Sequence, residues 1–213
     1  MEPRRATALE PRRMPRQERS KATTTAILRA AAQVFARHGY AAGTTNRIAA
    51  RAGVSIGSLY EYFPNKDAIL VALTEEHLRE ASAVLAGAVA EIRPGAPVGA
   101  AAIRRLVAAM VELHATDPGL HRVLFEEAPL PRRVRRTIAE LEDAMIGRVE
   151  SWIRGDPRIR VPRPRLAASL IVQTVEALTH RMVLHAPEGV TADELAEEIA
   201  RVVRGYLGVK GRA

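Results

Sequence analysis

Hydroxyl-bearing and aromatic side chains are concentrated in residues 52–66, AGVSIGSLYEYFPNK. This stretch holds three of the seven Phe and Tyr residues of the chain, together with two glycines and two serines. A core segment would contain more aliphatic residues and fewer glycines, and a plain loop would lack the rings. Hydroxyl and ammonium groups donate hydrogen bonds to phosphate oxygens, and glycine lets a partner come close to the backbone. The stretch is therefore suited to contact with a polyanion.

The excess positive charge of the chain lies in its first third. Residues 1–66 carry 12 Lys or Arg and 4 Asp or Glu, whereas residues 67–213 carry 20 of each, so the whole net charge of +8 belongs to the first part. A basic first part followed by a neutral second part indicates a polyanion site near the N-terminal end. A disordered basic tail over residues 1–20 is a simpler explanation for the arginines there. It does not explain the composition of residues 52–66.

The elements that carry these side chains are expected to be helices. Apolar residues recur at helical spacing between breaks that contain Pro or Gly, and no alternating run is long enough for a sheet, so we expect an all-α chain. A first helix over about 21–38 precedes two short helices, one capped by Thr44 or Thr45 and the other by Ser55. Two short helices joined by a tight, glycine-containing turn predict a helix-turn-helix over 44–63.

The remaining residues are expected to form a bundle of five or six amphipathic helices. Thr191 and Glu194 form a capping box at the start of the last helix, over about 191–207. The segment over about 164–185 is apolar on more than one face, so it should be buried on more than one side. Another helix is predicted by apolar residues at intervals of three or four, namely Val134, Ile138, Leu141, Met145, Val149 and Trp152.

The run ILRAAAQVFARHGYAAGTTNRIAARAGVSIGSLYEYFPNKDAIL resembles the DNA-binding domain of the TetR family of transcriptional regulators. The shared features come in one order: a helix that ends in FARHGY, a threonine pair, IAARAGVS, and then GSLYEYFPNK. The likeness covers about residues 23–70 without a gap, and it departs from the family at Gly43, where threonine is frequent. It implies a three-helix DNA-binding domain over 21–66. It also implies a regulatory domain over 67–213 that binds a ligand and forms a homodimer.

A helix-turn-helix places its second helix in the major groove, so small or base-reaching side chains are expected at the start of that helix. Ile56 could touch a thymine methyl group, and Asn46 or Arg47 is the better candidate for a polar contact with a base. Tyr60 and Tyr62 could donate their hydroxyls to phosphates, or be packed tyrosines with an exposed tip. The predicted DNA-binding residues are Thr44, Thr45, Asn46, Arg47, Ser55, Ile56, Gly57, Ser58, Tyr60, Tyr62 and Lys66. The tail arginines could enter a minor groove or only add nonspecific affinity.

Candidates for ligand binding in the second domain are weaker. Three are polar groups in otherwise apolar helices and three are more simply explained as core: Arg105, His114, His121, Met110, Met145 and Trp152. No pair among the six histidines has a metal-ligand spacing with a third ligand, and His180 and His185 lie on different sides of one helix. No nucleophile–base arrangement, glycine-rich phosphate loop or catalytic carboxylate pair can be picked out. We therefore expect no metal, no cofactor and no enzymatic activity.

These features predict a ligand-responsive repressor that binds a palindromic DNA operator as a homodimer, through its last two helices. The two recognition helices of the dimer would lie one turn of DNA apart, about 34–36 Å. The ligand is expected to be small and apolar or amphipathic, and to act by moving the fourth helix. An activator, a nonspecific DNA-binding protein of the same fold and an enzyme with a relic helix-turn-helix are the alternatives. The lack of a signal peptide, of an apolar run long enough for a membrane span and of cysteine predicts a cytoplasmic protein without a membrane partner.

Overall fold

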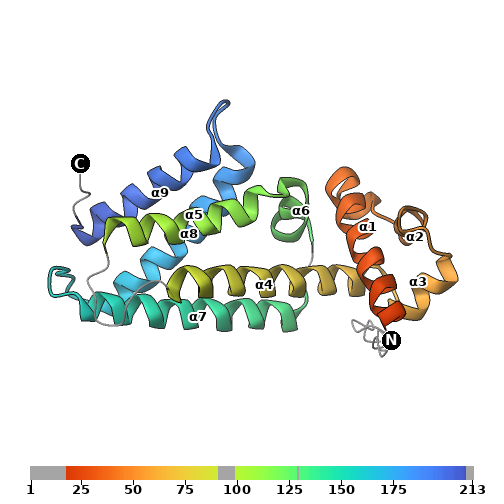
Figure 1. The fold of residues 1–213 in the computed structure, drawn as a ribbon, viewed down its shortest axis with the longest axis horizontal. Helices are drawn as coiled ribbons and strands as arrows, with labels where there is room; N and C mark the ends of the chain where they lie inside the picture. Colours follow the sequence, from red (N-terminus) through yellow and green to blue (C-terminus); the bar gives the residue numbers. More distant parts are fainter. Residues whose placement is uncertain (1–17, 91–98, 129, 210–213) are drawn as a thin grey trace, which may run out of the picture. The chain divides into compact units, whose positions relative to one another are not determined.

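The computed structural model describes residues 18–90, 99–128 and 130–209, and every regular element in these ranges is helical (Figure 1). In chain order the helices are α1 (Glu18–Ala42), α2 (Thr45–Ala52), α3 (Ile56–Tyr62), α4 (Lys66–Ala90), α5 (Ala100–Ala115), α6 (Pro118–Arg122), the π-helical turn η1 (Val123–Glu127), α7 (Arg132–Gly155), α8 (Pro164–His185) and α9 (Ala192–Leu207). The predicted all-α fold is confirmed. None of the described helices is both long enough and apolar enough to cross a membrane. The tail predicted over residues 1–20 lies outside the described residues up to residue 17.

The chain forms two compact units. The first, called the head below, consists of the residues up to His77 together with Gly119–Val134, and the second, called the bundle, consists of Leu78–Pro118 and Arg135–Ala213. The segment after α6 returns to the head, where Val123 and Leu124 are buried in its core. Sequence patterns could not reveal this return, because it depends on packing between segments that are far apart in the chain. The functional division at residue 66 stays a prediction.

Capping contacts define the short helices of the head. Thr44 Oγ1 accepts the N–H of Arg47 at 3.3 Å at the start of α2, and Ser55 Oγ accepts the N–H of Ser58 at 3.0 Å at the start of α3. Gly53 ends α2 with a φ of 68°, a left-handed conformation that glycine adopts without steric cost. The two capping contacts and the turn at Gly53, together with the packing of α2 against both α1 and α3, complete the predicted helix-turn-helix (Figure 1).

Two glycines shape the end of α1. The predicted end of this helix at about residue 38 is followed by Gly39, which makes a kink with φ 73° and ψ 171°, and the helix resumes up to Ala42. Gly43 follows, and a Cβ atom at this position would lie 2.3 Å from Cδ1 of Phe35. Phe35 is fully buried in the head core, so its ring has little room to move. The departure from threonine at position 43 thus has a packing reason.

The core of the bundle comes from α5, α7, α8 and α9, and α5 packs against both α8 and α9. The capping box that starts α9 is formed by Thr191 and Glu194 as predicted. Leu141, predicted on the apolar stripe of α7, is exposed. The buried aliphatic side chains of α5, α7 and α9 include Ile103, Val107, Val111, Ile146, Ile153, Leu195, Ile199 and Val203.

The last two helices carry several apolar side chains that the bundle core leaves exposed. On α9, Val202 and Tyr206 are 53% and 49% exposed, although the sequence places them on the same apolar face as the buried residues. On α8, Leu166 and Leu170 are 50% and 46% exposed. Each pair has i, i+4 spacing, so its two members lie on one side of the helix.

Candidate nucleic-acid interface and bundle interior

The candidate DNA-binding surface lies on the outer sides of α2 and α3. Ile48 and Leu59 on the inner sides of the same helices have no exposed surface. The predicted contact residues that are exposed are Thr44, Asn46, Arg47, Ser55, Ile56, Gly57 and Tyr60. Those that are half-buried are Thr45, Ser58, Tyr62 and Lys66. The two helices therefore bury their apolar sides in the head and present the predicted residues outward, while contact with DNA stays a prediction.

Gly57 is not required by the packing of the head. A Cβ atom at this position would have only Ser55 Oγ within 4 Å, at 3.8 Å, which is an ordinary contact. The φ of Gly57 is not positive, so residues other than glycine can adopt its backbone conformation as well. The absence of a side chain at residue 57 therefore leaves space on the outer side of α3, beside the exposed Ile56.

The two tyrosines of α3 have different surroundings. Tyr60 is exposed, and its hydroxyl lies 3.1 Å from Thr45 Oγ1, which joins α3 to α2. Tyr62 is half-buried and packs against the head core, and its hydroxyl accepts a hydrogen bond from Ser20 Oγ at 3.4 Å. Tyr60 thus has more of its side chain available to an external partner, whereas Tyr62 also ties α3 to the start of α1.

Lys66 forms contacts inside the head. Its Nζ donates to the carbonyl oxygens of Tyr40, at 2.9 Å, and Ala41, at 3.3 Å, and lies 4.2 Å from the centroid of the Tyr40 ring. A positive charge is favourable at these carbonyls, because they end α1. The Tyr40 hydroxyl donates to Asp67. Burial is the larger cause that raises the pKa of Tyr40, and the Asp67 carboxylate is the second. The phosphate contact of Lys66 stays a prediction, and it would compete with both hydrogen bonds.

The sequence reasoning missed a contact between η1 and the kink in α1. Glu127 Oε2 accepts the N–H of Tyr40 at 2.8 Å, and Glu127 Oε1 pairs with Arg122 Nε at 3.0 Å. The only local signal is Gly39, which indicates a break in α1 but not the acceptor 87 residues beyond Tyr40.

The predicted ligand-binding residues lie in different surroundings. Arg105 is exposed on α5. His121 is buried and belongs to the head, where its ring centroid lies 4.7 Å from that of Phe125. The other four belong to the bundle and are buried or half-buried: Met110, His114, Met145 and Trp152. Ligand binding by this set stays a prediction.

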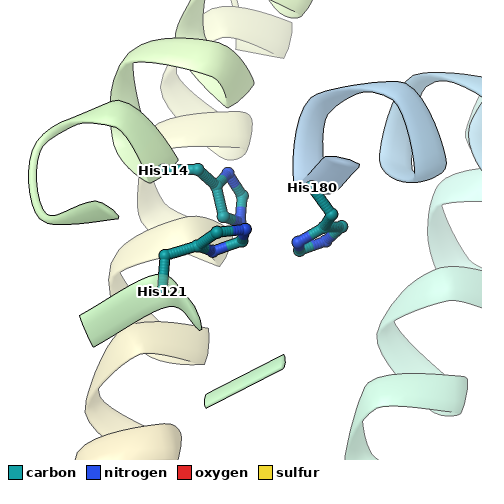
Figure 2. Close-up of side chains that lie close together, drawn as sticks. All are labelled: His114, His121 and His180. Carbon is teal, nitrogen blue, oxygen red and sulfur yellow. The ribbon is translucent and has the colours of Figure 1, made fainter. Parts of the chain in front are cut away.

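His114 of α5 and His180 of α8 come together in the bundle (Figure 2). Their ring centroids are 4.6 Å apart and the rings meet edge to face, at 72°. His114 is 3% exposed, and its Nδ1 lies 2.7 Å from the carbonyl oxygen of Met110. Burial lowers the pKa of His114, against the smaller effect of this hydrogen bond, so the imidazole is held neutral. Spacing along α8 relates His180 only to His185, so the sequence does not reveal this pair.

Two more polar side chains of α8 are buried or half-buried in the bundle, Thr179 and Glu176. Burial, and then the nearby carboxylate of Glu142, raise the pKa of Glu176. Thr179 is fully buried, and its Oγ1 has no hydrogen-bond partner among the described residues. An unpaired buried hydroxyl costs free energy that a bound polar group would recover. The bundle interior thus contains polar groups beside its aliphatic core, and a ligand site there stays a prediction.

Sequence profiles of regulatory proteins match two successive parts of the chain. The profile described as "Bacterial regulatory proteins, tetR family" matches residues 27–73, which contain the helix-turn-helix. The profile described as "Tetracyclin repressor-like, C-terminal domain" matches residues 100–207, about half of the chain.

Two curated proteins are similar over part of their length. The fatty acid metabolism regulator protein of Bacillus subtilis (strain 168) is 42% identical over 52 residues, which are 24% of this chain and 27% of that protein. An HTH-type transcriptional repressor of Streptomyces coelicolor is 30% identical over 122 residues, 54% of this chain and 58% of that protein. The match thus spans about a quarter of the length of the Bacillus subtilis protein and somewhat over half of the length of the Streptomyces coelicolor protein.

Solved structures of regulators share the fold. A TetR-like transcriptional regulator from Rhodococcus sp. RHA1 superimposes with a TM-score of 0.69 at 22% identity, over 92% of this chain and 100% of that chain. The regulator FadR from Bacillus subtilis in complex with stearoyl-CoA gives a TM-score of 0.64 at 21% identity, over 89% of this chain and 99% of that chain. With both profiles matched, the chain belongs to the TetR family of bacterial regulatory proteins, a family of transcription regulators and not of enzymes.

Proposed function

We propose that this protein is a transcriptional repressor that binds a palindromic DNA operator as a homodimer and is released from it by a small ligand. The observation that carries the proposal is the outward-facing set of polar and small residues on α2 and α3. It belongs to the part of the chain that holds the whole excess of positive charge. Binding to duplex DNA requires a positively charged region and a recognition helix whose side chains are small enough to enter the major groove.

In the proposed complex, base contacts and phosphate contacts come from different residues. Ile56 and Gly57, at the start of α3, would face the floor of the major groove, and Asn46 or Arg47, at the start of α2, would make the polar base contact. Tyr60 and the threonines of α2 would donate hydroxyls to phosphates, which fixes the position of the head but carries no sequence information.

The homodimer would form through α8 and α9. These helices pack against each other, and each exposes an i, i+4 pair of apolar side chains, Leu166 with Leu170 and Val202 with Tyr206. Exposed apolar residues that come in such pairs are typical of a face that a partner covers. A two-fold axis at this face would give two heads and therefore a palindromic site.

The ligand is proposed to be small and amphipathic. The bundle interior combines an aliphatic core with the polar side chains of His114, Glu176 and Thr179, a mixture that suits a molecule with an apolar body and a polar group. The Bacillus subtilis FadR structure contains stearoyl-CoA, which is such a molecule. Helix α4 begins in the head and ends in the bundle, so a ligand that moved it would change the position of the recognition helices.

Fluorescence anisotropy with the DNA upstream of the protein's own gene, against a scrambled duplex and across a salt series, tests the proposal. We expect the natural duplex to bind about 10³-fold or more tightly at physiological salt. Equal binding of both duplexes, with a steep loss of affinity in salt, would instead support a nonspecific DNA-binding protein. A reporter gene behind the bound sequence then distinguishes repression from activation.

A further inference from the structure

We propose that His114 and His180 form a binding site for a first-row transition-metal ion such as Zn²⁺ inside the bundle. The two residues are 66 positions apart in the sequence and come from different helices, α5 and α8. Their spacing along the chain does not indicate a metal site, because only the packing of α5 against α8 brings them together. Side chains on facing helices are a usual source of metal ligands in helical bundles.

The separation of the two rings suits a shared ion. A ligand nitrogen of His114 and one of His180 lie within 4.8 Å of each other. Two imidazole nitrogens on one tetrahedral Zn²⁺ are about 3.4 Å apart, since each Zn–N bond is about 2.0–2.1 Å long. The rings meet edge to face at 72° (Figure 2), and the half-buried His180 ring would turn to place its nitrogen on the same ion as Nε2 of His114.

The hydrogen bond of His114 supports the role of a metal ligand. Its Nδ1 lies 2.7 Å from the Met110 carbonyl oxygen, and a carbonyl only accepts, so Nδ1 carries the proton and Nε2 the lone pair. Histidines that bind metals are oriented in this way, with one ring nitrogen donating to a backbone carbonyl and the other directed at the ion. The His114 ring is therefore held in the tautomer that coordinates through Nε2.

The chemistry of the chain favours an ion that imidazole binds well. Cysteine is absent from the sequence, so thiolate ligands are excluded, and two neutral imidazoles prefer Zn²⁺, Co²⁺, Ni²⁺ or Cu²⁺ over Mg²⁺ or Ca²⁺. Water would complete the coordination, which leaves positions that exchange. This inference does not depend on the proposed operator binding, because the ion is measured without DNA.

Titration of the full-length, metal-free protein with Co²⁺ tests the site through the visible absorption of the bound ion, with Zn²⁺ then added as competitor. We expect one Co²⁺ per chain, displaced by Zn²⁺, and a loss of at least tenfold in affinity in both His114→Gln and His180→Gln. His185→Gln is the matched control, because this exposed histidine ends the same helix α8. It should bind like the wild type.

Three outcomes would overturn the assignment. One is the absence of stoichiometric binding in the wild type. The second is binding that survives in both His114→Gln and His180→Gln. The third is binding that is lost in His121→Gln, a head residue, but kept in either bundle variant. Should His114→Gln fail to fold by circular dichroism, the wild type still decides: Zn²⁺ must shift the ¹⁵N resonances of two imidazole rings, and unchanged ring resonances contradict the site.

Discussion

Glu127 Oε2 accepts the backbone N–H of Tyr40 at 2.8 Å, across 87 positions of the sequence. The contact ties the π-helical turn η1 to α1 just after the kink at Gly39, where the backbone leaves the helical conformation. The other oxygen of the same carboxylate pairs with Arg122, so one side chain holds both the turn and the end of α1.

Glu127→Ala is expected to destabilise the protein by about 1–2 kcal/mol, because a backbone N–H loses a charged acceptor. Urea unfolding followed by circular dichroism measures this change. Glu140→Ala is the control, since Glu140 pairs with Arg136 on the exposed face of α7, where ion pairs contribute little. Equal unfolding midpoints for Glu127→Ala and the wild type would show that the contact does not stabilise the head.

Gly57→Ala is expected to separate DNA binding from folding. The added methyl group meets only Ser55 Oγ at 3.8 Å, and alanine favours helix by up to about 1 kcal/mol, so the melting temperature should stay or rise. Affinity for the operator should fall, because the methyl group enters the space left for DNA. Gly43→Ala is the contrasting variant: its methyl group would overlap with Phe35, so stability should fall. Unchanged operator affinity in Gly57→Ala would argue against close approach at this residue.

Asn46→Ala should reduce the preference for the operator over a scrambled duplex by about 1–3 kcal/mol if the amide reads a base. Asn46 is exposed, so the fold should be unaffected. The salt dependence of binding should stay the same, because an uncharged side chain releases no counterions. Anisotropy with both duplexes across a salt series measures the operator preference and the salt dependence, and circular dichroism checks the fold. A uniform loss on both duplexes would instead assign Asn46 to the backbone of the DNA.

Val202→Glu should convert the proposed dimer into a monomer, because a carboxylate would be buried without a partner in the interface. Light scattering after gel filtration gives the mass directly. Val190→Glu is the matched control, an exposed valine in the loop before α9, at 41% exposure against 53% for Val202. A Val202→Glu protein that is still dimeric would place the interface elsewhere.

His114 should make the stability of the protein depend on pH below neutrality. Burial lowers its pKa in the folded state, so between that pKa and the ordinary value of about 6.5 only the unfolded chain takes up the proton. The free energy of unfolding should therefore fall as the pH drops below about 6.5, and level off below the folded pKa. Urea unfolding at several pH values, in the wild type and in His114→Gln, checks this. An equal slope in the variant would assign the effect to other groups.

The helix-turn-helix could be predicted from the sequence because its determinants are local. Thr44 and Ser55 cap helices through N–H groups three residues further on, and Gly53 sets its own backbone conformation. The outward side of α2 and α3 also follows from the sequence, since helical periodicity separates Ile48 and Leu59 from their exposed neighbours. The start of α9 was predicted for the same reason, as its capping box, Thr191 with Glu194, is a short-range pattern.

The tertiary structure alone decided which distant groups meet. Glu127 reaches Tyr40, and His180 reaches His114, only because helices far apart in the sequence pack together. Lys66 is predicted as a phosphate ligand from its place in the motif, and only the folded chain shows that its Nζ also donates to carbonyls at the end of α1. Spacing along one helix reveals neighbours within about four residues, whereas contacts between helices depend on their crossing and side-chain rotamers, which no local pattern encodes.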